Sequence, residues 1–231
     1  MTWATFKLFV LEKLSSDGDG SVDLTNSAYG SVFDLRCQNY LNLMFRESYY
    51  LYSGDVALTG AAGQAFIGSN TGNPIVFEVE YLYVQDASGN LKAPMQRTTY
   101  FEMKSEWTID RVYARGQGEP DLWACDREGN VVFNRLLDAA TAARVHVGGW
   151  SLHPSIPNDA TVLALSDIHA DLAATFCAYL FMEPVASEQI SIARLKTYNQ
   201  KAYDGINDLK SRQLGLHFGS PRKASGALRT R

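Results

Sequence analysis

The sequence lacks the features of a membrane span, a signal peptide or a disulfide-stapled secreted protein. No stretch approaches the ~18–20 consecutive apolar residues that cross a bilayer. The first residues have neither a basic start nor a long apolar segment. Three cysteines, Cys37, Cys125 and Cys177, cannot all pair within one chain, and none belongs to a C-x-x-C motif. We therefore expect no membrane contact, a reducing compartment, and cysteines that serve as small apolar residues.

Catalytic signatures are missing as well. No serine lies in a G-x-S-x-G motif. The glycine-rich stretch 60–72 lacks the G-K-[ST] of a phosphate loop, and Gly116-Gln117-Gly118 lacks the third glycine of a dinucleotide fingerprint. The sequence therefore predicts no cofactor and favours a protein that is not an enzyme.

Metal-ligand patterns are incomplete. The segment 17–23 resembles the start of a calcium loop, but Val22 and Ala28 occupy the positions that need Gly and a bidentate Glu. The four histidines show no ligand spacing: His146, His153, His169 and His217. We expect no metal. An enzyme hypothesis would need scattered residues to converge in space, for example His146, His153 and Asp159.

What the sequence does contain is an uneven charge. The chain has 231 residues, 46% of them hydrophobic and 20% charged, as in a globular protein. Its formal net charge is −4. Residues 209–231 carry six of the 21 Lys/Arg and no acid, a charge of +6, so residues 1–208 carry the other 15 and all 25 Asp/Glu, a charge of −10. An acidic body with a basic tail is typical of a chain whose tail makes contacts.

Helical periodicity marks both ends of the chain. The spacing predicts helices over 2–14 and 32–47, with Thr2 and Ser31 as caps, and over 167–182 and 187–213, with Ser166 and Ser187 as caps. Gly215 is expected to end the last helix. The expected buried stripe of the first helix is Trp3, Phe6, Val10 and Leu14. That of the third helix is Ile168, Leu172, Phe176, Tyr179 and Leu180. That of the fourth helix is Leu195, Tyr198, Ala202, Ile206 and Leu209.

The middle of the chain has β character. Ile75–Val84 alternates, which predicts Ile75, Phe77, Val79, Tyr81 and Tyr83 on one face. The D-x-x-G-N sequences 86–90 and 126–130 predict two tight turns, which we interpret as two hairpins of one antiparallel sheet. Arg144–Trp150 predicts a further strand.

These elements together predict an α+β fold. Residues 1–48 and 155–214 are expected to form a helical bundle of two N-terminal and two C-terminal helices. Residues 49–154 are expected to form an inserted antiparallel β domain, and residues 215–231 an extended basic C-terminal tail. The tail supplies the candidate partner-binding residues, which are Leu216, Phe218, Arg222, Lys223, Arg229 and Arg231.

The order of elements and several local sequences resemble the head-to-tail adaptor (connector) proteins of tailed bacteriophages. The features that carry the resemblance are the helix from Trp3 and the sequences Phe45–Tyr50, Leu58–Gln64, Gly118–Trp123, Asn130–Phe133 and Ser155–Asp159, the last of these ahead of two final helices.

The resemblance implies a structural virion protein in the neck, made in the host cytoplasm, with twelve copies in a ring between portal and tail or nozzle proteins. Genomic DNA would pass through the lumen without sequence-specific binding, since an acidic surface repels phosphate. The C-terminal tail would dock on the portal or on a neighbouring subunit. A ring needs two different complementary surfaces on each copy, and the acidic body and basic tail are one such pair.

The alternative is a nucleic-acid-binding module that uses the basic tail. Six cations on duplex phosphate would give a slope of about −5 in log affinity against log salt. The body shows no basic patch interleaved with aromatics, which favours the adaptor hypothesis over this one.

Overall fold

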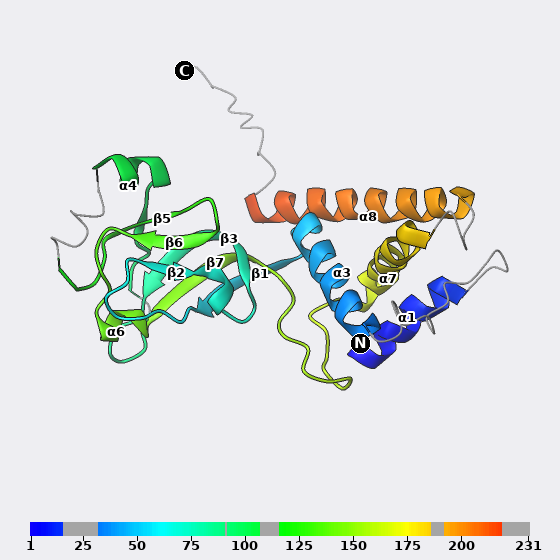
Figure 1. The fold of residues 1–231 in the computed structure, drawn as a ribbon, viewed down its shortest axis with the longest axis horizontal. Coiled ribbons are helices and arrows are strands. Elements are labelled where there is room, and N and C mark those ends of the chain that lie inside the picture. The colour runs from blue at the N-terminus through cyan, green and yellow to red at the C-terminus, as the bar shows by residue number, and fades with distance from the viewer. Residues whose placement is uncertain (16–31, 91, 107–115, 186–191, 219–231) are drawn as a thin grey trace, which may run out of the picture.

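The computed structural model describes residues 1–15, 32–90, 92–106, 116–185 and 192–218. Within these residues the chain has an α+β fold with six α-helices and two β-sheets. Figure 1 shows the strands with α4 and α6 on one side of the molecule and α1, α3 and α7 on the other, with α8 running over the helical part and ending beside the strands. The helices are α1 (Trp3–Ser15), α3 (Phe33–Ser48), α4 (Tyr100–Glu106), α6 (Ala139–Ala142), α7 (Asp167–Met182) and α8 (Ile192–Phe218), with 3-10 turns η1 (Ser69–Thr71) and η2 (Glu183–Val185).

Helix α1 packs as its spacing predicts. Trp3, Phe6, Val10 and Leu14 are all buried, and the Thr2 hydroxyl accepts a hydrogen bond from the Thr5 amide at 3.3 Å. They share one hydrophobic cluster with buried residues of α3, α7 and α8. Helix α3 likewise buries Cys37, Leu41, Met44 and Phe45 at helical spacing. Its expected cap, Ser31, and the calcium-like segment 17–23 lie outside the described residues.

Helix α7 lies in the middle of this cluster. Ser166 caps it as predicted, by accepting a hydrogen bond from the Ile168 amide. Phe176 and Tyr179 of the predicted stripe are buried, and Leu172 and Leu180 pack half-buried against the cluster. The buried surface is wider than predicted, because α1, α3 and α8 cover α7 and also bury its small residues Ala170, Ala173, Ala174 and Ala178. Ile168, expected in the core, is 86% exposed because it projects from the first turn, before these helices cover α7.

Helix α8 ends five residues later than predicted. It buries Ala202, Ile206 and Leu209 of its expected stripe, but it passes through Gly215 and continues to Phe218. The extended tail therefore does not start at residue 215. A glycine in a helix costs only ~1 kcal/mol relative to Ala, which is too little to stop a 27-residue helix. The expected cap Ser187 lies outside the described residues.

The β part holds two sheets rather than the single sheet predicted. The three-stranded sheet has the order β1-β7-β3, with β1 (Leu51–Ala57), β7 (Val145–Ser151) and β3 (Val76–Val84) antiparallel. The four-stranded sheet has the order β2-β6-β5-β4, with β2 (Phe66–Gly68), β6 (Asn130–Phe133), β5 (Leu122–Cys125) and β4 (Gln96–Arg97). Only β4 and β5 are parallel within the described sheets. A second hydrophobic cluster joins the two sheets.

Both D-x-x-G-N turns form, with Gly89 and Gly129 at φ values of 83° and 84°. Asp86 and Asp126 each accept hydrogen bonds from backbone amides two and four residues later, which closes the turns. The second turn joins β5 to β6 as a hairpin. After the first turn the chain returns along β3, where the Lys92 and Met95 amides donate to the Val84 and Leu82 carbonyls. It then passes into β4, which pairs with β5 in the other sheet rather than with β3.

Strand β3 does not keep the predicted face. Its register against β7 shifts between Val76 and Glu78 and again between Val79 and Tyr81. Each extra residue reverses the alternation of side chains. As a result Val79 lies in the second cluster with Leu82 and Val84, whereas Tyr81 and Tyr83 lie on the opposite face.

The central strand β7 is crossed by a tyrosine. The Tyr81 side chain reaches over Gly148, and its hydroxyl donates a hydrogen bond of 2.8 Å to the Gly54 carbonyl of β1. A Cβ on Gly148 would lie only 2.1 Å from the Tyr81 ring. The glycine is therefore what allows the ring to lie flat across the sheet.

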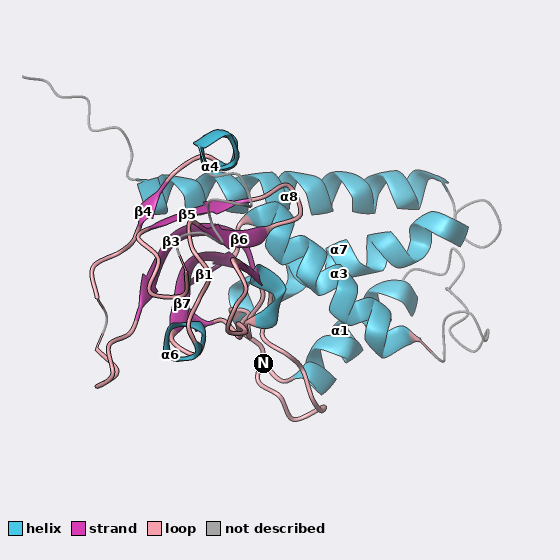
Figure 2. Cartoon of the chain, turned by 60° about the vertical axis from the view of Figure 1, so that its left-hand side comes forward, coloured by secondary structure: helices cyan, strands magenta, loops and turns pink. Residues whose placement is uncertain are grey.

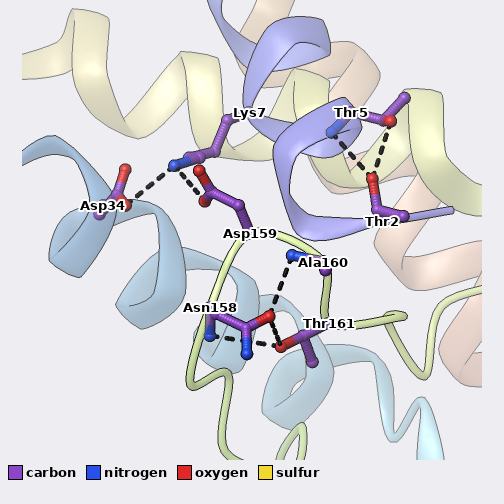
Figure 3. Close-up of polar contacts among 8 residues, drawn as sticks. All are labelled: Thr2, Thr5, Lys7, Asp34, Asn158, Asp159, Ala160 and Thr161. Carbon is purple, nitrogen blue, oxygen red and sulfur yellow. Dashed lines mark hydrogen bonds and ion pairs between the residues drawn. The ribbon is translucent and has the colours of Figure 1, made fainter.

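The segment 152–166 ties the β part to the helices. The Lys7 ammonium on α1 lies 2.9 Å from Asp34 on α3 and 2.7 Å from Asp159 in this segment (Figure 3). In the same loop Asn158 accepts hydrogen bonds from Ala160 and Thr161. Figure 2 shows how α1, α3 and α7 gather beside the sheets, with the N-terminus next to this loop.

Candidate interaction surfaces

The predicted partner-binding residues lie at the end of α8 or beyond it. Leu216 is in the last turn of the helix and is 80% exposed, and Phe218 is the last residue of the helix. The four cations of the tail, Arg222, Lys223, Arg229 and Arg231, lie outside the described residues. The structure therefore describes the helix end that precedes residues 219–231, but not the cations themselves.

The C-terminal half of α8 approaches the β part at Tyr49. The Lys210 ammonium lies over the Tyr49 ring, 5.0 Å from its centre. Tyr49 ends α3 in the left-handed conformation, with φ 51°, which is uncommon for a bulky residue. Its ring packs edge-on against Phe77 and Trp150, at centroid distances of 5.8 and 5.4 Å. This packing fixes the ring between the helix and the sheet.

The three-stranded sheet turns a polar aromatic surface away from the second cluster. We call this surface the tyrosine face and define it by Tyr49, Tyr52, Tyr81, Tyr83 and Trp150 with the acids Asp55, Glu78 and Glu80. Its rings contact one another, and Tyr83 also stacks on the imidazole of His146. Asp55 and Glu78 are exposed, the side chains of Tyr49, Tyr52, Tyr81 and Glu80 are half-buried, and Tyr83 and Trp150 are buried beneath them.

Glu80 is held from two strands. Its two oxygens accept hydrogen bonds from the Tyr52 hydroxyl at 3.0 Å and from the Trp150 indole at 3.1 Å. Both donors are neutral, so these bonds orient the carboxylate without cancelling its charge. Burial, and then the neighbouring Glu80 carboxylate, raise the pKa of Tyr52. The tyrosine therefore stays a donor at physiological pH.

Sequence reasoning missed this face. The alternation of Tyr81 and Tyr83 in Ile75–Val84 is a visible signal, but alternation alone does not tell a core face from an aromatic surface. Tyr49 and Tyr52 come from the end of α3 and from β1, a strand that no clear periodicity marks.

His153 anchors the segment between β7 and α7. It is buried, and its Nε2 accepts a hydrogen bond of 2.8 Å from the Ala164 amide while its Nδ1 lies 2.6 Å from the Pro154 carbonyl. The pair of contacts fits the neutral ring with the proton on Nδ1. Burial lowers the pKa of His153, with the Pro154 carbonyl acting weakly in the opposite direction. The asparagine Asn42 of α3 accepts from the His153 amide and extends the anchor.

The residues of the enzyme hypothesis have separate partners. His146 pairs with Asp55 on the tyrosine face, His153 bonds the backbone of its own segment, and Asp159 pairs with Lys7. The structure does not bring them together. Among the residues that the structure describes, no group of three or more His, Cys, Asp or Glu could hold a metal ion. Burial raises the pKa of the Cys37 and Cys177 thiols, which makes both poor nucleophiles.

A search for helices able to span a bilayer finds none in the described residues. No protein-family model and no curated protein matches the sequence.

Proposed function

We propose that this chain is a structural subunit of a homo-oligomeric ring, a head-to-tail adaptor between the portal and the tail of a tailed bacteriophage. The observation that carries the proposal is α8. This 27-residue helix spans the helical part, reaches the β part at Tyr49 and ends with Leu216 exposed, immediately before the basic segment. A helix that ends exposed, directly before a cationic sequence, suits a subunit that contacts a partner.

A closed ring needs two different surfaces on each copy. Exposed apolar side chains in two separate regions support such a pair. Val162 and Ile168, 71% and 86% exposed, lie near the start of α7, whereas Phe66 and Phe101, 50% and 80% exposed, lie in β2 and α4 of the β part. Large apolar side chains left this exposed are available for contacts with another protein.

In this proposal residues 1–48 and 155–218 form the helical bundle and residues 49–154 the inserted β domain. Twelve copies form the ring in the virion neck, and tail or nozzle proteins bind its β side. The cations Arg222, Lys223, Arg229 and Arg231 pair with carboxylates of the portal or of a neighbouring copy. Genomic DNA passes through the lumen without sequence-specific contact.

The test is assembly of the purified full chain, alone and mixed with portal protein, followed by light scattering and negative-stain imaging. We expect rings, either of the chain alone or on the portal. A chain that ends at Phe218 should keep the same circular dichroism and lose portal docking. A stable monomer that ignores the portal contradicts the ring, and unchanged docking of the shortened chain contradicts the role of the tail.

A further inference from the structure

The tyrosine face has the chemistry that recognises arginine and lysine. The half-buried rings of Tyr49, Tyr52 and Tyr81 attract cations through their π faces, and carboxylates beside them form charge-assisted hydrogen bonds with guanidinium groups. Asp55 and Glu78 present exposed carboxylates, and Glu80 adds a third that neutral donors hold in place. Lys210 on the Tyr49 ring is an example of such a contact within the molecule.

A segment of matching charge begins beside this face. Residues 219–231 contain Arg222, Lys223, Arg229 and Arg231 and no acid. They follow α8, whose Lys210 contacts the face, and Phe218 lies about 12 Å further along the helix axis at 1.5 Å per residue. Thirteen residues span up to about 43 Å when extended, which exceeds the length of β3, about 30 Å for nine residues.

We propose that the tyrosine face binds the chain's own C-terminal segment, residues 219–231, in the free protein. The tether supports binding within one chain, because a short flexible connection gives an effective concentration in the millimolar range. Weak individual ion pairs therefore suffice. The segment leaves the face when a partner protein with a more acidic surface binds residues 219–231 more tightly. This inference concerns the free chain and does not depend on the proposed ring.

The experiment is site-specific photocrosslinking in the full chain, with p-benzoylphenylalanine in place of Leu228. An equal mixture of ¹⁵N-labelled and unlabelled protein separates crosslinks within a chain from those between chains. We expect crosslinks within one chain to peptides of β1, β3 and β7. Glu78→Gln and Asp55→Asn should each reduce their yield at least twofold. The matched control is Glu128→Gln, an equally exposed glutamate in the turn of the other sheet, which should leave the yield unchanged.

Salt provides the second readout. Raising sodium chloride from 0.05 to 0.5 M should reduce the same crosslinks severalfold, because exposed ion pairs are screened. Crosslinks that form only between labelled and unlabelled chains would overturn the proposal and make a second copy the occupant. Crosslinks confined to other elements, or a yield indifferent to Glu78→Gln, Asp55→Asn and salt, would overturn the tyrosine face as the receptor. Ring formation is measured separately, so the two proposals fail independently.

Discussion

Replacing Gly148 with alanine tests whether Tyr81 crosses the sheet as described. The new Cβ would lie 2.1–2.5 Å from three atoms of the Tyr81 side chain, far inside contact distance. The ring must therefore lift away, and its hydroxyl then loses the 2.8 Å hydrogen bond to the Gly54 carbonyl. Nothing else in the substitution removes a contact, because glycine has no side chain to lose.

Three terms set the size of the effect. Overpacking of one methyl costs about 1–3 kcal/mol, and the lost hydrogen bond costs about 0.5–1.5 kcal/mol. Alanine stabilises the fold by about 0.4–1 kcal/mol relative to glycine, because it lowers the conformational entropy of the unfolded chain. The free energy of unfolding should fall by about 2–3 kcal/mol, which lowers Tm by about 5–10 °C in a chain of this length.

The assay is urea unfolding of Gly148→Ala, Tyr81→Ala and the double variant. Once the ring is gone, the alanine at 148 should cost nothing or stabilise slightly, so the two changes are strongly non-additive. Gly215→Ala is the control, since no atom lies within 4 Å of the position that a Cβ would take there on α8. Equal losses from Gly148→Ala with and without Tyr81 would refute the crossing.

Three further outcomes are expected. Gly205→Ala should destabilise by about 1 kcal/mol instead of gaining the usual helix propensity, because its Cβ would meet Leu172 of α7 at 2.4 Å; a gain in urea unfolding would contradict this close approach. Stability should fall as pH drops below about 6.5, because the lowered pKa of His153 means that protonation favours the unfolded chain; His153→Phe should lose that part of the pH slope in a pH series of unfolding curves. Arg194→Met should cost about 1.5–3 kcal/mol, because the guanidinium donates to the Lys13 and Leu14 carbonyls at the end of α1; thermal unfolding within 1 °C of the parent would count against that contact.

The helices are the most predictable part of the chain. In α1 one side meets the core and the other meets solvent, so 3.6-residue periodicity identifies all four buried positions. The same periodicity identifies only part of the buried surface of α7, because other helices cover it on several sides and bury its alanines as well. The predicted end of α8 is wrong for a different reason: the helix propensity of Gly215 is weak, and a weak propensity is not a stop signal.

The sheets are less predictable, because their faces depend on register. One inserted residue moves every following side chain to the other side, and β3 contains two such shifts. No feature of the β3 sequence indicates these register shifts. The tyrosine face could not be predicted from the sequence, because its composition depends on these register shifts. Part of it also comes from β1, where Gly54 and Asp55 interrupt the apolar pattern.

The helical part is built from the two ends of the chain, and this has a consequence for synthesis. Helix α1 packs on α7, and α3 packs on α7 and α8. More than a hundred further residues must therefore be synthesised after each of them before α7 can form. Both sheets lie entirely between them in sequence and can pair first. The apolar faces of α1 and α3 are then the last to be covered, and they are the surfaces that a chaperone would meet on the nascent chain.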